Sequence, residues 1–176
     1  RDRSIYIADA VSLGIGPFAG QGIQVYLRRG EFPALRSGDL VRVHGVLTSF
    51  RGEMELVLDQ PGQITRMYSV GPLLPLSVGF PQLGERMEGR LVSFRGVVTG
   101  AQGDSIFMAD PLRPRSPTIR VVVSDRFEWD RPVTQRGEVW LVTGVVSQLA
   151  KETPWNDGYR VLVRAPDDLE RLKAAR

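Results

Sequence analysis

The chain has 176 residues, of which 42% are hydrophobic and 24% charged, and its formal net charge is +3. This composition suits one large or two small globular domains, and the absence of cysteine excludes a disulfide framework and a thiolate metal site. No apolar run approaches the roughly 20 residues of a membrane helix, so we expect no membrane insertion. All but two of the 23 basic residues are arginine, which suits phosphate binding but equally suits a GC-rich genome or a heat-stable surface.

Residues 4–9 and 22–28 alternate apolar and polar side chains with a period of two, which predicts the two strands of a hairpin. The outer face of this hairpin then carries Tyr6, Gln24, Tyr26 and Arg28. Residues 14–20 between the strands are rich in glycine. We interpret them as a hairpin loop and not as a dinucleotide site, because Pro17 interrupts them and no helix follows to receive a pyrophosphate.

Residues 38–47 read as a glycine and an acid at a turn, an alternating strand, and a second glycine at Gly45. A glycine within a strand indicates a bulge or a barrel corner. Residues 53–58 alternate as the next strand, and we interpret Glu53 and Glu55 as its solvent face. The first unit accordingly spans residues 1–67.

Residues 68–85 contain three prolines and three glycines, which predicts a semi-rigid linker whose apolar residues pack along the units. The second unit spans residues 86–176 and repeats the first, because residues 105–110, 118–123 and 137–146 align with 4–9, 22–27 and 38–47. Residues 166–173 begin with proline and acids and predict a short terminal helix.

The second unit opens with a strand at residues 90–100 that has no counterpart before residue 4. An unpaired sheet edge is a liability for a small β protein. We therefore expect either that the chain is cut from a longer polypeptide or that residues elsewhere or another molecule complete the first unit, with strand exchange as one route.

Five strands with a bent first and a bent fourth strand describe the OB fold, a five-stranded Greek-key barrel. The predicted fold class is therefore all-β, with two OB-fold barrels in tandem, the first lacking its opening strand. Residues 4–9 and 22–26 resemble the anticodon-binding OB family of aminoacyl-tRNA synthetases, which implies base stacking by Tyr6 and Phe107 and base reading by Gln24 and Arg120. The bent-strand pattern is more similar to OB modules attached to secreted bacterial nucleases, which implies a secreted or envelope protein.

The functional prediction is a non-catalytic module of a larger protein that binds single-stranded DNA or RNA by base stacking and arginine–phosphate contacts. The candidate residues are Tyr6, Gln24, Tyr26, Arg28, Phe50, Arg51, Arg95, Phe107, Arg120, Trp155 and Arg160. The alternative is a protein-interaction or structural module of an envelope or secreted protein that holds flanking domains of the same polypeptide. In that case the outward aromatics cover the linker or the other unit, and Trp155 plugs its own loop.

The sequence offers no support for catalysis. The single histidine, His44, aligns with Thr143, and no serine or acid pairs with it by spacing. We therefore expect no catalytic residue, no metal and no cofactor, while the oligomeric state is left open.

Overall fold

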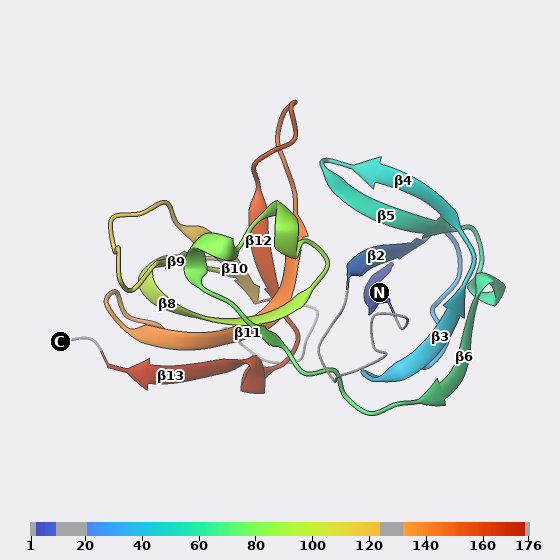
Figure 1. The fold of residues 1–176 in the computed structure, drawn as a ribbon, viewed down its shortest axis with the longest axis horizontal. Coiled ribbons are helices and arrows are strands. Elements are labelled where there is room, and N and C mark those ends of the chain that lie inside the picture. Colours follow the sequence, from blue (N-terminus) through green and yellow to red (C-terminus); the bar gives the residue numbers. More distant parts are fainter. Residues whose placement is uncertain (1–2, 10–20, 124–131, 175–176) are drawn as a thin grey trace.

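The computed structural model describes residues 3–9, 21–123 and 132–174, and the glycine-rich stretch 14–20 lies outside these residues. The described chain consists of strands and short 3-10 turns, and it contains no helix long and apolar enough to cross a membrane. Its two halves lie side by side and are joined by the segment that precedes residue 91 (Figure 1).

The C-terminal half is a closed barrel of five strands: β8 (Leu91–Gln102), β9 (Ser105–Ala109), β10 (Ile119–Val123), β11 (Val139–Gln148) and β12 (Tyr159–Val163). Neighbouring strands follow the order β8-β9-β10-β12-β11, and β11 pairs back with β8 to close the ring. The β10–β12 pair is parallel, and the other pairs within the ring are antiparallel. This is the Greek-key connection of an OB fold, so the predicted all-β fold class is confirmed.

Long, bent strands make the barrel possible. Gly144 lies at the bend of β11, where an added Cβ would come within 2.6 Å of the carbonyl oxygen of Leu162. Only glycine permits this approach between β11 and β12. Trp140 packs in the core, and its Nε1 donates a 3.1 Å hydrogen bond to Glu138.

The predicted linker packs closely on the barrel. Its strand β7 (Leu76–Ser77) pairs in parallel with β8, and two 3-10 turns follow, η3 (Phe80–Gln82) and η4 (Glu85–Met87). Phe80 meets Phe94 of the barrel core edge to face, with ring centroids 5.9 Å apart. The expectation that the apolar residues of the linker pack along a unit is therefore confirmed for Leu76, Val78 and Phe80, whereas Leu74 is 47% exposed.

The N-terminal half forms two smaller sheets. The first has the order β1-β2-β5-β4, with β1 (Ser4–Ala8), β2 (Gly22–Leu27), β5 (Glu53–Leu58) and β4 (Val46–Phe50). The second pairs β3 (Asp39–Val43) with β6 (Ile64–Ser69), after the 3-10 turn η2 (Pro61–Gln63). Val25, Leu27, Leu58 and Ile64 are the buried residues between them.

The pairings of the N-terminal half repeat those of the barrel in register. Tyr6 lies opposite Gln24 as Phe107 lies opposite Arg120. Strand β2 then pairs in parallel with β5, as β10 does with β12. Even the irregularity in β3–β6, at Leu40/Val41, recurs in the pairing of β11 with the C-terminal strand, at Val139/Trp140. The described residues include no counterpart of β8 beside β1, so the tandem pair of barrels stays a prediction.

The C-terminal segment differs from the predicted helix. A 3-10 turn, η5 (Pro166–Asp168), leads into strand β13 (Leu169–Lys173), which pairs antiparallel with β11. Proline and acids suit the first turn of a 3-10 helix as well as that of an α-helix, and the open edge of β11 then favours a strand. The first half has the same order, a 3-10 turn at Pro61 followed by β6. This repeat was the available signal for a strand at the C-terminus.

Candidate functional site

Tyr6 lies between the two halves and not on an open face. Its ring packs against Leu91 and Val145 of the barrel, and its hydroxyl donates a 2.7 Å hydrogen bond to Oε1 of Glu53. Burial, together with the negative charge of Glu53, raises the pKa of the Tyr6 phenol. The predicted solvent-facing ring is therefore not observed; Tyr6 instead covers the other unit, which was the alternative.

Glu53 is only 4% exposed, so its interpretation as part of a solvent face is wrong. Alternation correctly placed it on the outer face of β5, but the barrel covers that face. Its Oε2 accepts a 3.0 Å hydrogen bond from the hydroxyl of Ser147. Burial raises the pKa of Glu53 to about 7, because the loss of hydration outweighs the hydrogen bonds from Tyr6 and Ser147.

Backbone contacts also join the halves. The amide of Ala150 donates to the carbonyl of Arg51 at 2.9 Å, and the amide of Met54 donates to Oε1 of Glu88 at 3.1 Å. Gly22 lies directly against the backbone of Gly89, where a Cβ would have no room. The first half thus meets the barrel through the outer face of its β1-β2-β5 sheet.

On the barrel, Phe107, Arg120 and Arg160 form a row across three neighbouring strands, as the registers show. Arg120 donates through Nε to Ser105 at 2.6 Å and pairs with Asp104 at 3.0 Å. Arg160 donates to Oγ of Ser147 at 3.3 Å, and burial lowers its pKa. The predicted pair of Phe107 and Arg120 is therefore adjacent, and Arg160 connects it to the contact between the halves.

Two aromatic side chains that were predicted from separate loops lie on neighbouring segments: Phe50 ends β4, and the loop that carries Trp155 contacts the next residue, Arg51, through the amide of Ala150. Phe50 is 54% exposed and Trp155 is 39% exposed, so Trp155 does not plug its loop. The guanidinium carbon of Arg51 lies 5.6 Å from the centroid of the Phe50 ring. The buried Gln148 side chain donates to the carbonyls of Trp155 and Asp157, at 2.8 and 2.9 Å, and so fixes the second loop. We call these segments, residues 50–52 and residues 149–158 between β11 and β12, the rim.

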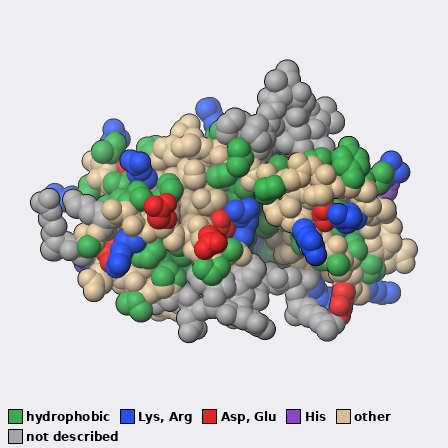
Figure 2. Space-filling model, turned by 90° about the horizontal axis from the view of Figure 1, so that it is seen from below, with side chains coloured by type: hydrophobic (Ala, Val, Ile, Leu, Met, Phe, Trp, Pro, Cys, Tyr) green, Lys and Arg blue, Asp and Glu red, His purple; other side chains and the backbone are tan. Residues whose placement is uncertain are grey.

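The other predicted residues lie elsewhere. Gln24 and Tyr26 are half-buried on β2, and Arg28 is exposed beyond its end, where it pairs with Asp59 at 3.2 Å. Arg95 is exposed on β8, opposite Leu141. Basic side chains are interspersed with acidic and hydrophobic ones on the face drawn in Figure 2. The charges on that face therefore form no continuous basic stripe.

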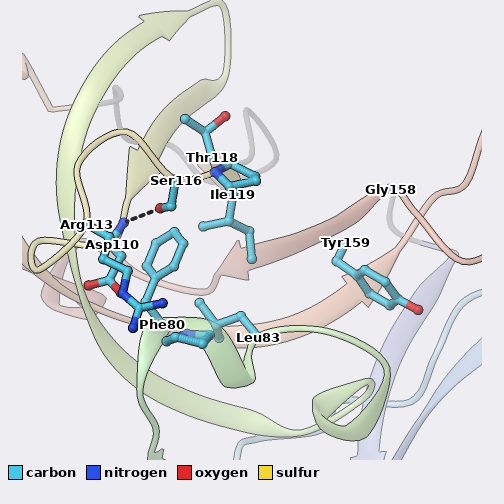
Figure 3. A pocket seen from close by; sticks show the side chains of 11 residues that line it. Phe80, Leu83, Asp110, Arg113, Ser116, Thr118, Ile119, Gly158 and Tyr159 are labelled. Carbon is cyan, nitrogen blue, oxygen red and sulfur yellow. Dashed lines mark hydrogen bonds between the residues drawn. The ribbon is translucent and has the colours of Figure 1, made fainter.

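A hollow of about 410 Å³ lies where the linker covers one end of the barrel, and sequence reasoning did not find it. Phe80 and Leu83 form one wall, facing Ile119, while Arg113 and Tyr159 lie at its two sides (Figure 3). Its lining comes from the linker, from the loop before β10 together with Ile119, and from Gly158 and Tyr159 at the start of β12. No local sequence pattern could therefore have indicated it.

No protein-family model matches the chain, and no curated relative matches it. Among solved structures, it is similar to the telomere capping protein Ten1 from Saccharomyces pombe, at 15% identity and a TM-score of 0.39, over 56% of this chain and 81% of that chain. It is also similar to the OBody AM3L09 bound to hen egg-white lysozyme, at 16% identity and a TM-score of 0.41, over 56% of this chain and 95% of that chain.

Proposed function

We propose that the chain is a non-catalytic module that binds single-stranded nucleic acid at the rim. The observation that carries this proposal is the exposure of Phe50 and Trp155 on two hydrogen-bonded loops beside Arg51. Aromatic platforms of this kind contribute about 1–3 kcal/mol per stacked base and accept every base. An arginine beside such a platform can bind phosphate or stack on a base.

The row on the barrel offers further candidate contacts. Strand β12 follows the Trp155 loop directly and carries Arg160, with Arg120 and Phe107 on the next two strands. Since Asp104 already pairs with Arg120, we assign the first phosphate contact to Arg51 and a secondary one to Arg120. Tyr6 is given no stacking role, because Leu91 and Val145 cover it.

The test is fluorescence anisotropy with labelled oligothymidylate and oligouridylate at low salt. We expect binding by the unaltered chain and a loss of about tenfold or more when Phe50→Ala and Trp155→Ala are combined. Leu112→Ala is the matched control, because Leu112 is a 90% exposed apolar residue on a loop outside the rim. Absence of binding at low salt, or unchanged binding by the double variant, would overturn the proposal.

A second candidate is a structural or protein-interaction module, and the buried contact of Tyr6, Glu53 and Ser147 favours it. A face that contacts another unit of the same chain has a structural role and cannot also bind a ligand. In this case the rim would contact a neighbouring domain. Failure of both oligonucleotides to bind would leave this candidate as the better account of the exposed aromatics.

A further inference from the structure

The core of the N-terminal half is less completely buried than the core of the barrel at matching positions. Ile5 and Ile7 are only half-buried, whereas the residues at the same register positions of the barrel, Ile106 and Met108, are 0% exposed. Val43 is likewise half-buried, although its counterpart Val142 is 0% exposed. These inward-facing side chains are therefore packed on one side only.

Leu47 shows the same difference most clearly. It is 59% exposed, whereas Val146, its counterpart by register, is 0% exposed. In the barrel, the segment leading into β8 lies alongside the backbone of Val146, because the amide of Gly89 donates to the Val146 carbonyl at 2.8 Å and the Val146 amide donates to the Arg90 carbonyl at 3.0 Å. Leu47 is thus exposed where a counterpart of this segment would lie.

Among the described residues, no strand pairs with the corresponding edge of β1. Hydrogen bonds from Leu27 to Arg3 and from Asp9 to Gln21 show that odd-numbered residues of this strand bond to β2. In an antiparallel pair the alternate residues point their N–H and C=O groups the other way. The backbone groups of Ser4, Tyr6 and Ala8 therefore face an edge that no described strand occupies, whereas β9 uses this edge to pair with β8.

We propose that the opening bounded by β1, β3 and β4 binds one antiparallel strand with the chemistry of β8, and that this strand is the stretch of polypeptide leading directly into β1. The strand presents apolar side chains inward, as β8 does with Val92, Phe94 and Val98. Its two edges bond to β1 and to the β3–β4 segment.

Connection geometry favours a strand continuous with β1. In the barrel, β8 ends at Gln102 and β9 begins at Ser105, so a two-residue turn joins these two strands. A strand followed by a two-residue turn into Ser4 needs only the same connection. A second copy would have to release its own β8, which is held by β9 on one edge and by β11 on the other.

The experiment compares the 176-residue chain with a version in which the sequence of residues 90–104 precedes Ser4 directly in place of residues 1–3. We expect the grafted chain to remain monomeric, to unfold at a higher temperature, and to exchange the β1 amides of Tyr6 and Ala8 about tenfold more slowly. The matched control is the same graft with the three positions copied from Val92, Phe94 and Val98 changed to serine. It should protect neither amide.

Equal protection by the serine graft, or no protection by the apolar graft, would overturn the proposal. Dimers formed by the apolar graft would overturn the assignment to a continuous strand. Protection of the β11 amides in the same exchange experiment checks in each case that the barrel is folded. Leu47→Asp gives a second readout, because it should greatly destabilise the grafted chain and leave the ungrafted chain nearly unchanged. None of these measurements depends on oligonucleotide binding.

Discussion

The hydroxyl of Ser147 donates a 3.0 Å hydrogen bond to Glu53 across 94 positions of sequence, and this bond joins the two halves of the molecule. Tyr6 donates to the other oxygen of the same carboxyl group. The face of the N-terminal half that was predicted to stack bases is therefore its contact with the barrel. Two exposed aromatics, Phe50 and Trp155, remain for a ligand at the rim.

Burial of Glu53 predicts a pH-dependent stability. Its pKa rises from 4.5 to about 7 on folding, so the folded chain retains a proton that the unfolded chain releases. The free energy of unfolding should therefore fall by up to about 3 kcal/mol as pH rises through this window. Urea denaturation at about pH 5 and about pH 8 should show a smaller fall for Glu53→Gln. The raised pKa values of Glu55 and Glu88 act in the same direction in both proteins, and an unchanged fall would contradict the assignment.

A methyl group at position 22 should separate the halves. Gly22→Ala places a Cβ on the backbone of Gly89, so we expect a loss of about 1–3 kcal/mol in unfolding free energy and faster exchange of the Ala150 amide, which donates to Arg51 across the halves. Gly62→Ala is the control, because nothing lies within 4 Å of the Cβ it adds. Equal effects of the two substitutions, measured by denaturation and hydrogen exchange, would show that the close approach is unimportant.

Leu47 and Val146 occupy the same register position in the two halves, but truncating them should change the free energy of unfolding by different amounts. Val146→Ala removes buried methyl groups from the barrel core and should cost about 1–3 kcal/mol. Leu47→Ala removes a larger but 59% exposed side chain and should cost less than about 0.5 kcal/mol. Chemical denaturation of both variants decides the matter, and a cost at Leu47 as large as that at Val146 would mean that the first half is already closed.

Arg51 should contribute to the salt dependence of oligonucleotide binding. If its guanidinium neutralises one phosphate, Arg51→Gln should reduce the slope of log K against log salt concentration by about 1. Arg115→Gln removes an exposed arginine from a loop outside the rim and should leave the slope unchanged. An anisotropy titration at several salt concentrations measures both slopes. A slope for Arg51→Gln equal to that of the unaltered chain would exclude this phosphate contact.

Periodicity in the sequence predicted most strands and which side chains point inward. Val25 and Leu27 alternate with polar neighbours and are buried, and the strand at residues 90–100 closes the barrel as β8. The repeat also predicted the pairing of Phe107 with Arg120. The terminal segment was predicted wrongly because its proline and acids are compatible with two local structures, and only the edge of β11 selects the strand.

The sequence by itself determined the alternation of each strand, the recurrence of one set of strands, and the glycines at the bends, because these depend on neighbours within a few residues. Only the tertiary structure decided that Tyr6 and Glu53 are covered while Phe50 and Trp155 remain exposed. Alternation indicates which side chains point away from the core of their own sheet. Whether such a face meets water or another sheet depends on contacts between distant segments, and in this protein the barrel covers one outward face and leaves the rim open.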